Sequence, residues 1–228
     1  MGLHHSPRIV TDGLVLCLDA ADKNSYPGSG NTWYDLSGQG NNGTLVNDPT
    51  FITEKGGGFS FDGTNDVVES TNKPSLQLTS TFSICCYCKL NSTSNNGHVA
   101  GKDDVSSGRS ISFGYGGSGN FRLLVVKNSS TIIYSNATNI TDNNVYHIAC
   151  TYDANGGVVL YKNSAIDYQN GTSSGEIDNV STIWTFGATT NNIFEINGDI
   201  YSVQIYNRAL TAQEIQQNYN ATKTRFGL

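Results

Sequence analysis

A histidine and a cysteine that could act as base and nucleophile lie three residues apart, at His147 and Cys150. Nucleophilic catalysis needs the two side chains within hydrogen-bonding reach of each other. Residues 145–152 have the pattern of a β-strand, and side chains three apart on a strand point to opposite faces. We therefore expect no catalytic pair at this place.

A second cysteine motif, Cys85-x-x-Cys88, lies inside another strand-like run. Redox-active pairs of this kind open a helix, and a zinc site would need a second pair of ligands. The chain has five cysteines, and the odd number does not suggest a disulfide framework. We predict that they are small apolar residues of the core, which favours folding in a reducing compartment.

An oxygen-rich turn at Asp62, Asn65 and Asp66 could supply the hard ligands that calcium prefers. The favoured alternative is that the two aspartates accept hydrogen bonds from the backbone of their own turn. Calcium is the one cofactor that the sequence suggests.

Four aromatic residues are candidates for a carbohydrate platform, because sugar sites combine an apolar ring with a few polar groups. They are Trp33, Tyr34, Tyr115 and Trp184. Both tryptophans lie in apolar surroundings, so packing in the core is the favoured alternative for them. Residues 102–108 and 114–119 could form the rim of such a site.

Short strand-like runs separated by Gly, Asn and Ser clusters must position these groups, as in a sandwich or barrel. In the strongest run, residues 82–90, Ile84, Cys86 and Cys88 share one face. Residues 59–70 are expected to form a tight hairpin. The other expected strands cover residues 14–18, 44–46, 98–102, 110–115, 121–127, 131–135, 145–152, 158–163, 183–186 and 198–206.

One short helix is expected after Thr211, since Thr211 and Glu214 have the spacing of a capping box. We predict a single domain over residues 13–221. An extended N-terminal arm over residues 1–12 precedes it, and an exposed tail over residues 222–228 follows it.

The composition excludes several classes of protein. Lys and Arg number 13 against 19 Asp and Glu, a net charge of -6, and an acidic chain without a basic stripe does not bind nucleic acid. Gly, Asn, Ser and Thr number 25, 26, 24 and 22 of 228 residues, which favours a β protein with many turns. No run of about 18 apolar residues occurs, so we expect no membrane insertion. The N-terminus lacks the apolar segment of a signal peptide.

Six segments in order resemble the laminin-G-like, concanavalin A-like jelly-roll superfamily. Four of their motifs are D-L-S-G at 35–38, F-S-F-D-G-T-N-D-V-V at 59–68, Y-H-I-A at 146–149 and I-Y-N-R-A-L at 205–210. The resemblance covers roughly residues 13–220. It implies an all-β, concanavalin A-like jelly-roll β-sandwich with one short C-terminal helix.

This superfamily includes glycoside hydrolases, which need two carboxylates on one strand. Their Glu-x-Asp-x-Glu signature is matched by Glu176 and Asp178, but Val180 stands at the third position. The segment also lies between expected strands, so we interpret it as a solvated turn. We therefore expect no enzyme, and no catalytic residue.

Other relatives, such as the pentraxins, hold calcium with further acidic residues. The matching stretch, residues 186–192, has no carboxylate. That departure weakens the expectation of calcium-dependent ligand binding through the turn at Asp62, Asn65 and Asp66.

Residues 5–15 and 19–38 also resemble virion structural proteins of large tailed bacteriophages. The resemblance implies a capsid decoration, knob or fibre protein, assembled in the host cytoplasm with other virion proteins. It also implies a homo-oligomer and adhesion to a host-surface glycan. A stand-alone carbohydrate-binding module, that is a lectin, is the alternative, and a glycoside hydrolase ranks last.

Overall fold

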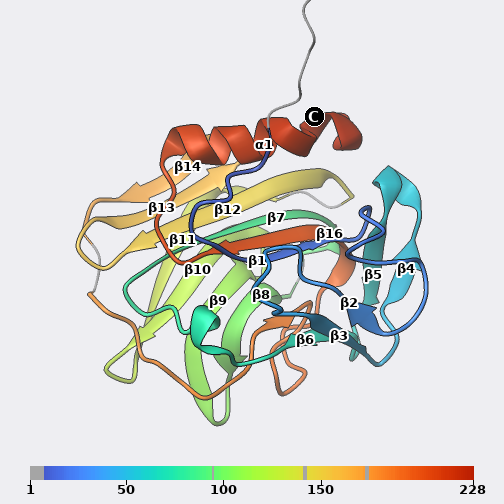
Figure 1. Cartoon of the computed structure of the whole chain (residues 1–228). Coiled ribbons are helices and arrows are strands. Elements are labelled where there is room, and N and C mark those ends of the chain that lie inside the picture. The colour runs from blue at the N-terminus through green and yellow to red at the C-terminus, as the bar shows by residue number, and fades with distance from the viewer. Residues whose placement is uncertain (1–7, 94, 141–142, 173–174) are drawn as a thin grey trace, which may run out of the picture.

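Two antiparallel β-sheets lie face to face, and the helix α1 covers the outer face of one of them (Figure 1). This computed structural model describes residues 8–93, 95–140, 143–172 and 175–228. The arrangement confirms the all-β sandwich expected from the sequence.

Sheet A runs in the order β14-β13-β12-β7-β16-β5-β4, with β1 also paired to β16. Its strands are β1 (Leu14–Asp19), β4 (Thr50–Ile52), β5 (Gly58–Asp62), β7 (Thr81–Ser92), β12 (Val145–Asp153), β13 (Gly157–Lys162), β14 (Ala165–Asn170) and β16 (Asn197–Tyr206). The short 3-10 helix η1 (Glu54–Gly56) joins β4 to β5.

Sheet B runs in the order β11-β10-β9-β8-β15-β6-β3-β2. Its strands are β2 (Thr32–Trp33), β3 (Gly43–Val46), β6 (Val67–Ser70), β8 (Gly97–Asp104), β9 (Gly108–Tyr115), β10 (Asn120–Lys127), β11 (Ser130–Asn139) and β15 (Thr185–Phe186). The 3-10 helix η2 (Pro74–Leu76) follows β6 in the chain.

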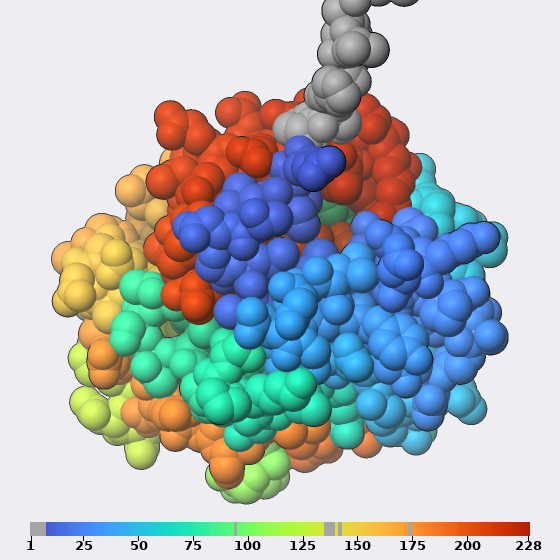
Figure 2. Space-filling view, viewed as in Figure 1, coloured from blue at the N-terminus to red at the C-terminus, as the bar shows by residue number. Residues whose placement is uncertain are grey.

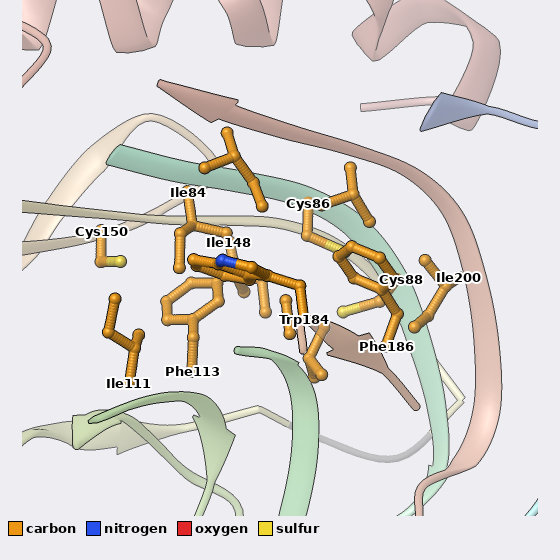
Figure 3. Packing of buried hydrophobic residues seen from close by; sticks show 14 of the residues in the cluster. Ile84, Cys86, Cys88, Ile111, Phe113, Ile148, Cys150, Trp184, Phe186 and Ile200 are labelled. Atoms are coloured by element: carbon orange, nitrogen blue, oxygen red, sulfur yellow. The ribbon is translucent and has the colours of Figure 1, made fainter. Parts of the chain in front are cut away.

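The main core fills the space between the sheets (Figure 3). As the alternation in β7 predicts, Ile84, Cys86 and Cys88 point into it, whereas Cys85 and Tyr87 belong to separate apolar clusters under α1. All five cysteines are buried and free, which confirms their role as apolar packing residues.

Helix α1 (Ala212–Phe226) begins with the predicted capping box between Thr211 and Glu214. The prediction of an exposed tail over residues 222–228 is wrong, because the helix continues to Phe226. Phe226 is 4% exposed and stacks on Tyr87, with ring centroids 4.1 Å apart. Packing against sheet A thus extends the helix beyond what its polar sequence suggests.

The prediction of an extended N-terminal arm is wrong from residue 8 onward, because this segment packs on the domain. The backbone N–H of Val10 donates to Oδ1 of Asn218 at 2.8 Å, and Gln217 donates to the carbonyl of Arg8 at 2.8 Å. Figure 2 shows the first described residues beside the surface of the C-terminal helix. Residues 1–7 lie outside the described residues.

The expected hairpin over residues 59–70 is also wrong, because its two strands belong to different sheets. Phe59 in β5 pairs with Ile200 and Phe51 in sheet A, whereas Val68 in β6 pairs with Leu45 and Phe186 in sheet B. Each strand contributes inward apolar side chains to the core, so the turn between them is a corner of the sandwich.

No helix in the described part of the chain is long and apolar enough to cross a membrane.

Candidate functional site

Loops from both sheets meet at one end of the sandwich and line a polar depression, which we call the loop-end pocket. It consists of two adjoining hollows of about 190 and 320 Å³, which share Gly63, Asn95 and Glu195. Their remaining lining residues are Ser92, Asn96, Tyr115, Phe194 and Asn197. Binding residues commonly lie on such loops, which a rigid scaffold holds in place.

Hydrogen bonds between the loops fix the frame of the pocket. Asn197 donates to the carbonyl of Asp62 at 3.2 Å and accepts from Asn91 at 3.0 Å. Asn96 accepts from the backbone N–H of Gly117 at 2.9 Å. The β5–β6, β7–β8 and β9–β10 connections are therefore tied to the start of β16 or to one another.

Phe194 occupies an uncommon backbone conformation at the edge of the pocket. Its φ is 60°, a left-handed value that bulky side chains rarely adopt. The backbone N–H of His98 donates to its carbonyl at 2.8 Å and holds this conformation. Such local strain is concentrated at binding and catalytic sites, and here it presents a partly exposed ring beside polar groups.

Two polar side chains of the pocket, those of Glu195 and Asn95, have no partner among the described residues. In the part of the chain that the structure describes, neither the carboxylate of Glu195 nor the side-chain amide of Asn95 makes a hydrogen bond or ion pair. Glu195 is nevertheless partly buried. These groups are free to accept and donate hydrogen bonds to a polar ligand.

The oxygen-rich turn at the same corner is engaged with its own backbone. Oδ2 of Asp66 accepts from the N–H of Asp62 at 3.0 Å, and Oδ1 of Asp62 accepts from Thr64 at 2.8 Å. The carbonyl of Asn65 accepts from Asn47. Burial raises the pKa of Asp66 above its usual range. Among the described residues, no group of three or more His, Cys, Asp or Glu side chains could hold a metal ion.

Three of the four aromatic residues considered for a sugar platform are buried, and for the two tryptophans this confirms the favoured alternative of packing in the core. Trp33 and Trp184 are 0% exposed, and Trp184 donates to the carbonyl of Leu76. Tyr115 is 2% exposed, so its faces cannot stack on a sugar, although its edge lines the loop-end pocket. Tyr34 is 45% exposed but does not line that pocket.

Tyr115 is covered because the start of β8 passes directly over it. A Cβ atom placed on Gly97 would lie 2.1 Å from Cζ of Tyr115, so only glycine fits there. The rim predicted at residues 114–119 does border the pocket, through Gly117 and Asn96. The rim predicted at residues 102–108 does not contribute to its lining.

A further hollow of about 260 Å³ lies at the start of β9 and contains Arg109 and Asp178. Both charges are satisfied within the protein. Asp178 accepts from the backbone N–H groups of Asn128 and Ser129 at 2.8 Å each, and Arg109 makes two hydrogen bonds to Asp103. Asp178 thus stabilises a turn, which agrees with the interpretation of residues 176–180 as a loop.

His98 is fully buried on the side of β8 that faces away from the core. Its Nδ1 lies 2.8 Å from Oγ of Ser112, and its Nε2 lies 3.3 Å from Oγ1 of Thr185. Burial lowers the pKa of His98 to about 4. The ring is therefore neutral at pH 7 and acts as a polar brace between strands.

A family model for the concanavalin A-like lectin/glucanases superfamily matches residues 62–216. The match covers more than half of the chain, and the chain belongs to this superfamily. No curated protein sequence matches the chain.

Solved structures with the same fold include the binding domain of Paraclostridial Mosquitocidal Protein 1, with a TM-score of 0.74 and 16% identity over 92% of this chain. The botulinum neurotoxin serotype D ligand binding domain in complex with N-acetylneuraminic acid is similar with a TM-score of 0.70 and 16% identity over 92% of this chain. Botulinum neurotoxin type C, whose cell entry depends on two ganglioside molecules, is similar with a TM-score of 0.72 and 16% identity over 93% of this chain. The chain spans 52%, 51% and 52% of these structures, or about half of each.

Proposed function

We propose that the protein is a non-catalytic carbohydrate-binding module whose ligand occupies the loop-end pocket. The observation that carries this proposal is the set of free polar groups in the pocket. Glu195 and Asn95 are unpaired in the described residues, and Phe194 offers an apolar surface beside them. Sugar hydroxyl groups need such donors and acceptors, while the apolar face of a sugar ring packs on an aromatic side chain.

The structural neighbours support a binding role, because two of them are described as binding domains. Two of the descriptions also name a sialic acid or gangliosides. Their identities of about 16% carry the fold and no site residue to this chain. The assignment of the ligand class to this protein is therefore our proposal.

A hydrolytic role is not favoured by the pocket. Glycoside hydrolysis by the common mechanisms needs two carboxylates at the scissile bond. Among the described residues that line the pocket, Glu195 is the one carboxylate. The two carboxylates of residues 176–178 lie elsewhere and are occupied, since Glu176 accepts from Ser80 and Asp178 from two backbone N–H groups.

Binding to a glycan array, measured with calcium and with a chelator, tests the proposal. We expect binding that does not depend on calcium, and a loss of about tenfold or more in Glu195→Gln and Asn95→Ala. Asn155→Ala is the matched control, because Asn155 is an exposed amide in the β12–β13 hairpin. No binding to any saccharide, or equal binding by all variants, would contradict the proposal.

We further propose that this module is displayed on a bacteriophage virion, where it serves as a decoration, knob or fibre protein and adheres to a host-surface glycan. The resemblance of residues 5–15 and 19–38 to phage structural proteins supports this proposal. On this view the protein assembles in the host cytoplasm with other virion proteins, as a homo-oligomer.

Copurification with intact particles at many copies per particle is the expected result, and absence from purified particles would contradict virion display. Deletion of residues 1–7 tests whether the N-terminus attaches the module. That deletion leaves the packed residues from Arg8 onward in place, so unchanged incorporation would exclude attachment through these seven residues.

A further inference from the structure

Arg122 is a partly buried cation for which the described residues supply no hydrogen-bond or ion-pair partner. The inward side chains of β10 are Phe121, Leu123 and Val125, so Arg122 lies on the outer face of sheet B. In the described part of the chain it makes no hydrogen bond and no ion pair. A buried or partly buried charge without a counter-ion costs free energy.

Three other arginines, Arg109, Arg208 and Arg225, are paired in the usual way. Arg109 binds Asp103 with two hydrogen bonds of 2.8 and 2.9 Å. Arg208 binds Glu214 through two nitrogens, and Arg225 binds Asp19 at 2.6 Å. The fold thus neutralises its other partly buried guanidinium groups and leaves Arg122 open.

On the side of β9, no side chain covers Arg122. Its cross-strand neighbour on β9 is Gly114, which has no side chain to cover the guanidinium group. A Cβ atom placed on Gly116 would lie 3.4 Å from Nη1 of Arg122 and 3.8 Å from Oδ1 of Asn96. Asn96 lines the loop-end pocket, so the guanidinium group reaches the rim of that pocket.

The local charge favours an anion. Burial and the nearby Arg109 lower the pKa of Arg122, with Asp103 acting in the opposite direction, yet a guanidinium group remains charged throughout the working pH range. Asp103 already neutralises Arg109, and His98 beside them is neutral at pH 7. One uncompensated positive charge therefore remains on this face of an acidic protein.

We propose that Arg122 binds the carboxylate of an acidic saccharide, such as a uronic or sialic acid, whose neighbouring sugar occupies the loop-end pocket. A guanidinium group binds a planar carboxylate with two parallel hydrogen bonds. In this arrangement, Glu195 accepts hydrogen bonds from hydroxyl groups of the sugar within the pocket. This inference rests on the proposed function and adds the ligand's charge to it.

An array of neutral, carboxylated and sulfated oligosaccharides, with a methyl-esterified copy of each carboxylated one, tests the inference. Esterification removes the charge and leaves the sugar unchanged. We expect the wild-type protein to bind carboxylated sugars about tenfold or more tightly than their esters. Arg122→Gln should lose this preference for the acid over the ester and keep its affinity for the esters. Arg122→Lys should retain part of the preference.

Lys23→Gln is the matched control, because it removes one positive charge from an exposed position in the β1–β2 connection. The ratio of its affinities for carboxylated sugars and for their esters should equal that of the wild-type protein. Equal binding of acids and esters, a ratio that survives in Arg122→Gln, or preference for sulfated over carboxylated sugars would overturn the inference and leave the proposed function standing. Binding to no saccharide at all would overturn both.

Discussion

The outer faces of the two sheets differ in what covers them. On sheet A, helix α1 buries a layer of large side chains, among them Tyr87, Tyr201 and Phe226. On sheet B, one cross-strand row runs through Thr44, Glu69, Thr185, Gly101, Ser112, Leu124 and the 52% exposed Ile133, and no helix of the described chain packs on it. The protein covers one face with its own helix and leaves the other, with its mixed polar and apolar side chains, without such a cover. The loop-end pocket and Arg122 lie at the margin of this second face.

Two fully buried histidines show the same contrast. His98, on sheet B, lies within hydrogen-bonding distance of Ser112 and Thr185. His147, under α1, lies between Tyr87 and Tyr219, and neither ring nitrogen has a hydrogen-bond partner among the described residues. The layer under α1 thus combines apolar packing, which tolerates the unsatisfied ring of His147, with hydrogen bonds such as that from Asn218 to the hydroxyl of Tyr206 at 2.9 Å. On sheet B, by contrast, both ring nitrogens of the buried His98 have hydrogen-bond partners.

The largest expected effect is that of Phe226→Ala. The substitution removes the ring that stacks on Tyr87 and contacts Tyr201, and we expect it to lower the free energy of unfolding by about 3 kcal/mol. Urea unfolding monitored by circular dichroism gives the value. The matching variant in the loop-end pocket is Phe194→Ala. We expect it to lower the free energy of unfolding by at most about 1 kcal/mol, because the ring of Phe194 is partly exposed. Equal losses of unfolding free energy in the two variants would contradict the proposed difference between the helix-covered face and the loop-end pocket.

The two histidines should respond in opposite directions to replacement by leucine. His98→Leu should cost about 2 kcal/mol, since it leaves Ser112 and Thr185 without their partner. His147→Leu should leave stability unchanged or raise it by up to about 1 kcal/mol, because it removes buried unpaired nitrogens. Thermal or urea unfolding at pH 8, where both rings are neutral in either state, isolates this effect.

The same histidines predict how stability depends on pH. Burial lowers the pKa of His98 to about 4 and that of His147 to about 3, from 6.5. The unfolded chain therefore binds more protons below pH 6.5, so stability should fall as the pH drops from 6.5 toward 4. In His98→Leu and in His147→Leu, the free energy of unfolding should fall less steeply over this pH range than in the wild-type protein. A stability that is flat between pH 6.5 and 4 would contradict the buried neutral state.

A smaller effect is expected at the start of α1. Arg208 holds the pKa of Glu214 at about 2, so this ion pair stabilises the protein above pH 4.5 and is lost as the pH falls through 2. Glu214→Gln should cost about 1 kcal/mol at pH 7, because the pair is partly exposed and glutamine preserves the capping box. Unfolding at pH 7 and pH 2 should show the difference disappearing in acid.

The smallest expected effect is that of Arg122→Gln. Because Arg122 has no partner in the described chain, its loss should change the free energy of unfolding by less than about 0.5 kcal/mol. A cost above 1 kcal/mol in urea unfolding would show that Arg122 supports the fold, and would remove the contrast with the paired Arg109.

Local signals in the sequence predicted much of the fold. The alternation in residues 82–90 predicted the two faces of β7, and the spacing of Thr211 and Glu214 predicted the helix start, because each signal lies within a few residues. Strand pairing is not local, so the sequence suggested a hairpin where β5 and β6 separate into two sheets. Strand β14 was missed because an exposed edge strand, here with Asp167 and Gln169, lacks the apolar alternation of an inner strand.

The candidate site could not be predicted because it joins four segments that are distant in the chain. Asparagine is present 26 times, so Asn95 or Asn96 carries no signal in the sequence. The place of Glu195 beside Asn95 follows from the geometry of the loops, which the sequence does not reveal. Three of the four aromatic residues suggested for a platform, Trp33, Tyr115 and Trp184, are at most 2% exposed, because large rings contribute most to stability when they are buried in the core.

The place of β16 in sheet A has a consequence for folding. Residues 197–206 lie between β7 on one side and β1 and β5 on the other, so β16 joins strands that are more than 100 residues away in the chain. Loop closure over such distances is slow. During synthesis, one edge of each of β1, β5 and β7 therefore stays unpaired until β16 has been made. An unpaired strand edge can pair with another chain, so the nascent protein needs protection from aggregation in that interval. For refolding of the complete chain, we expect a time of milliseconds to seconds.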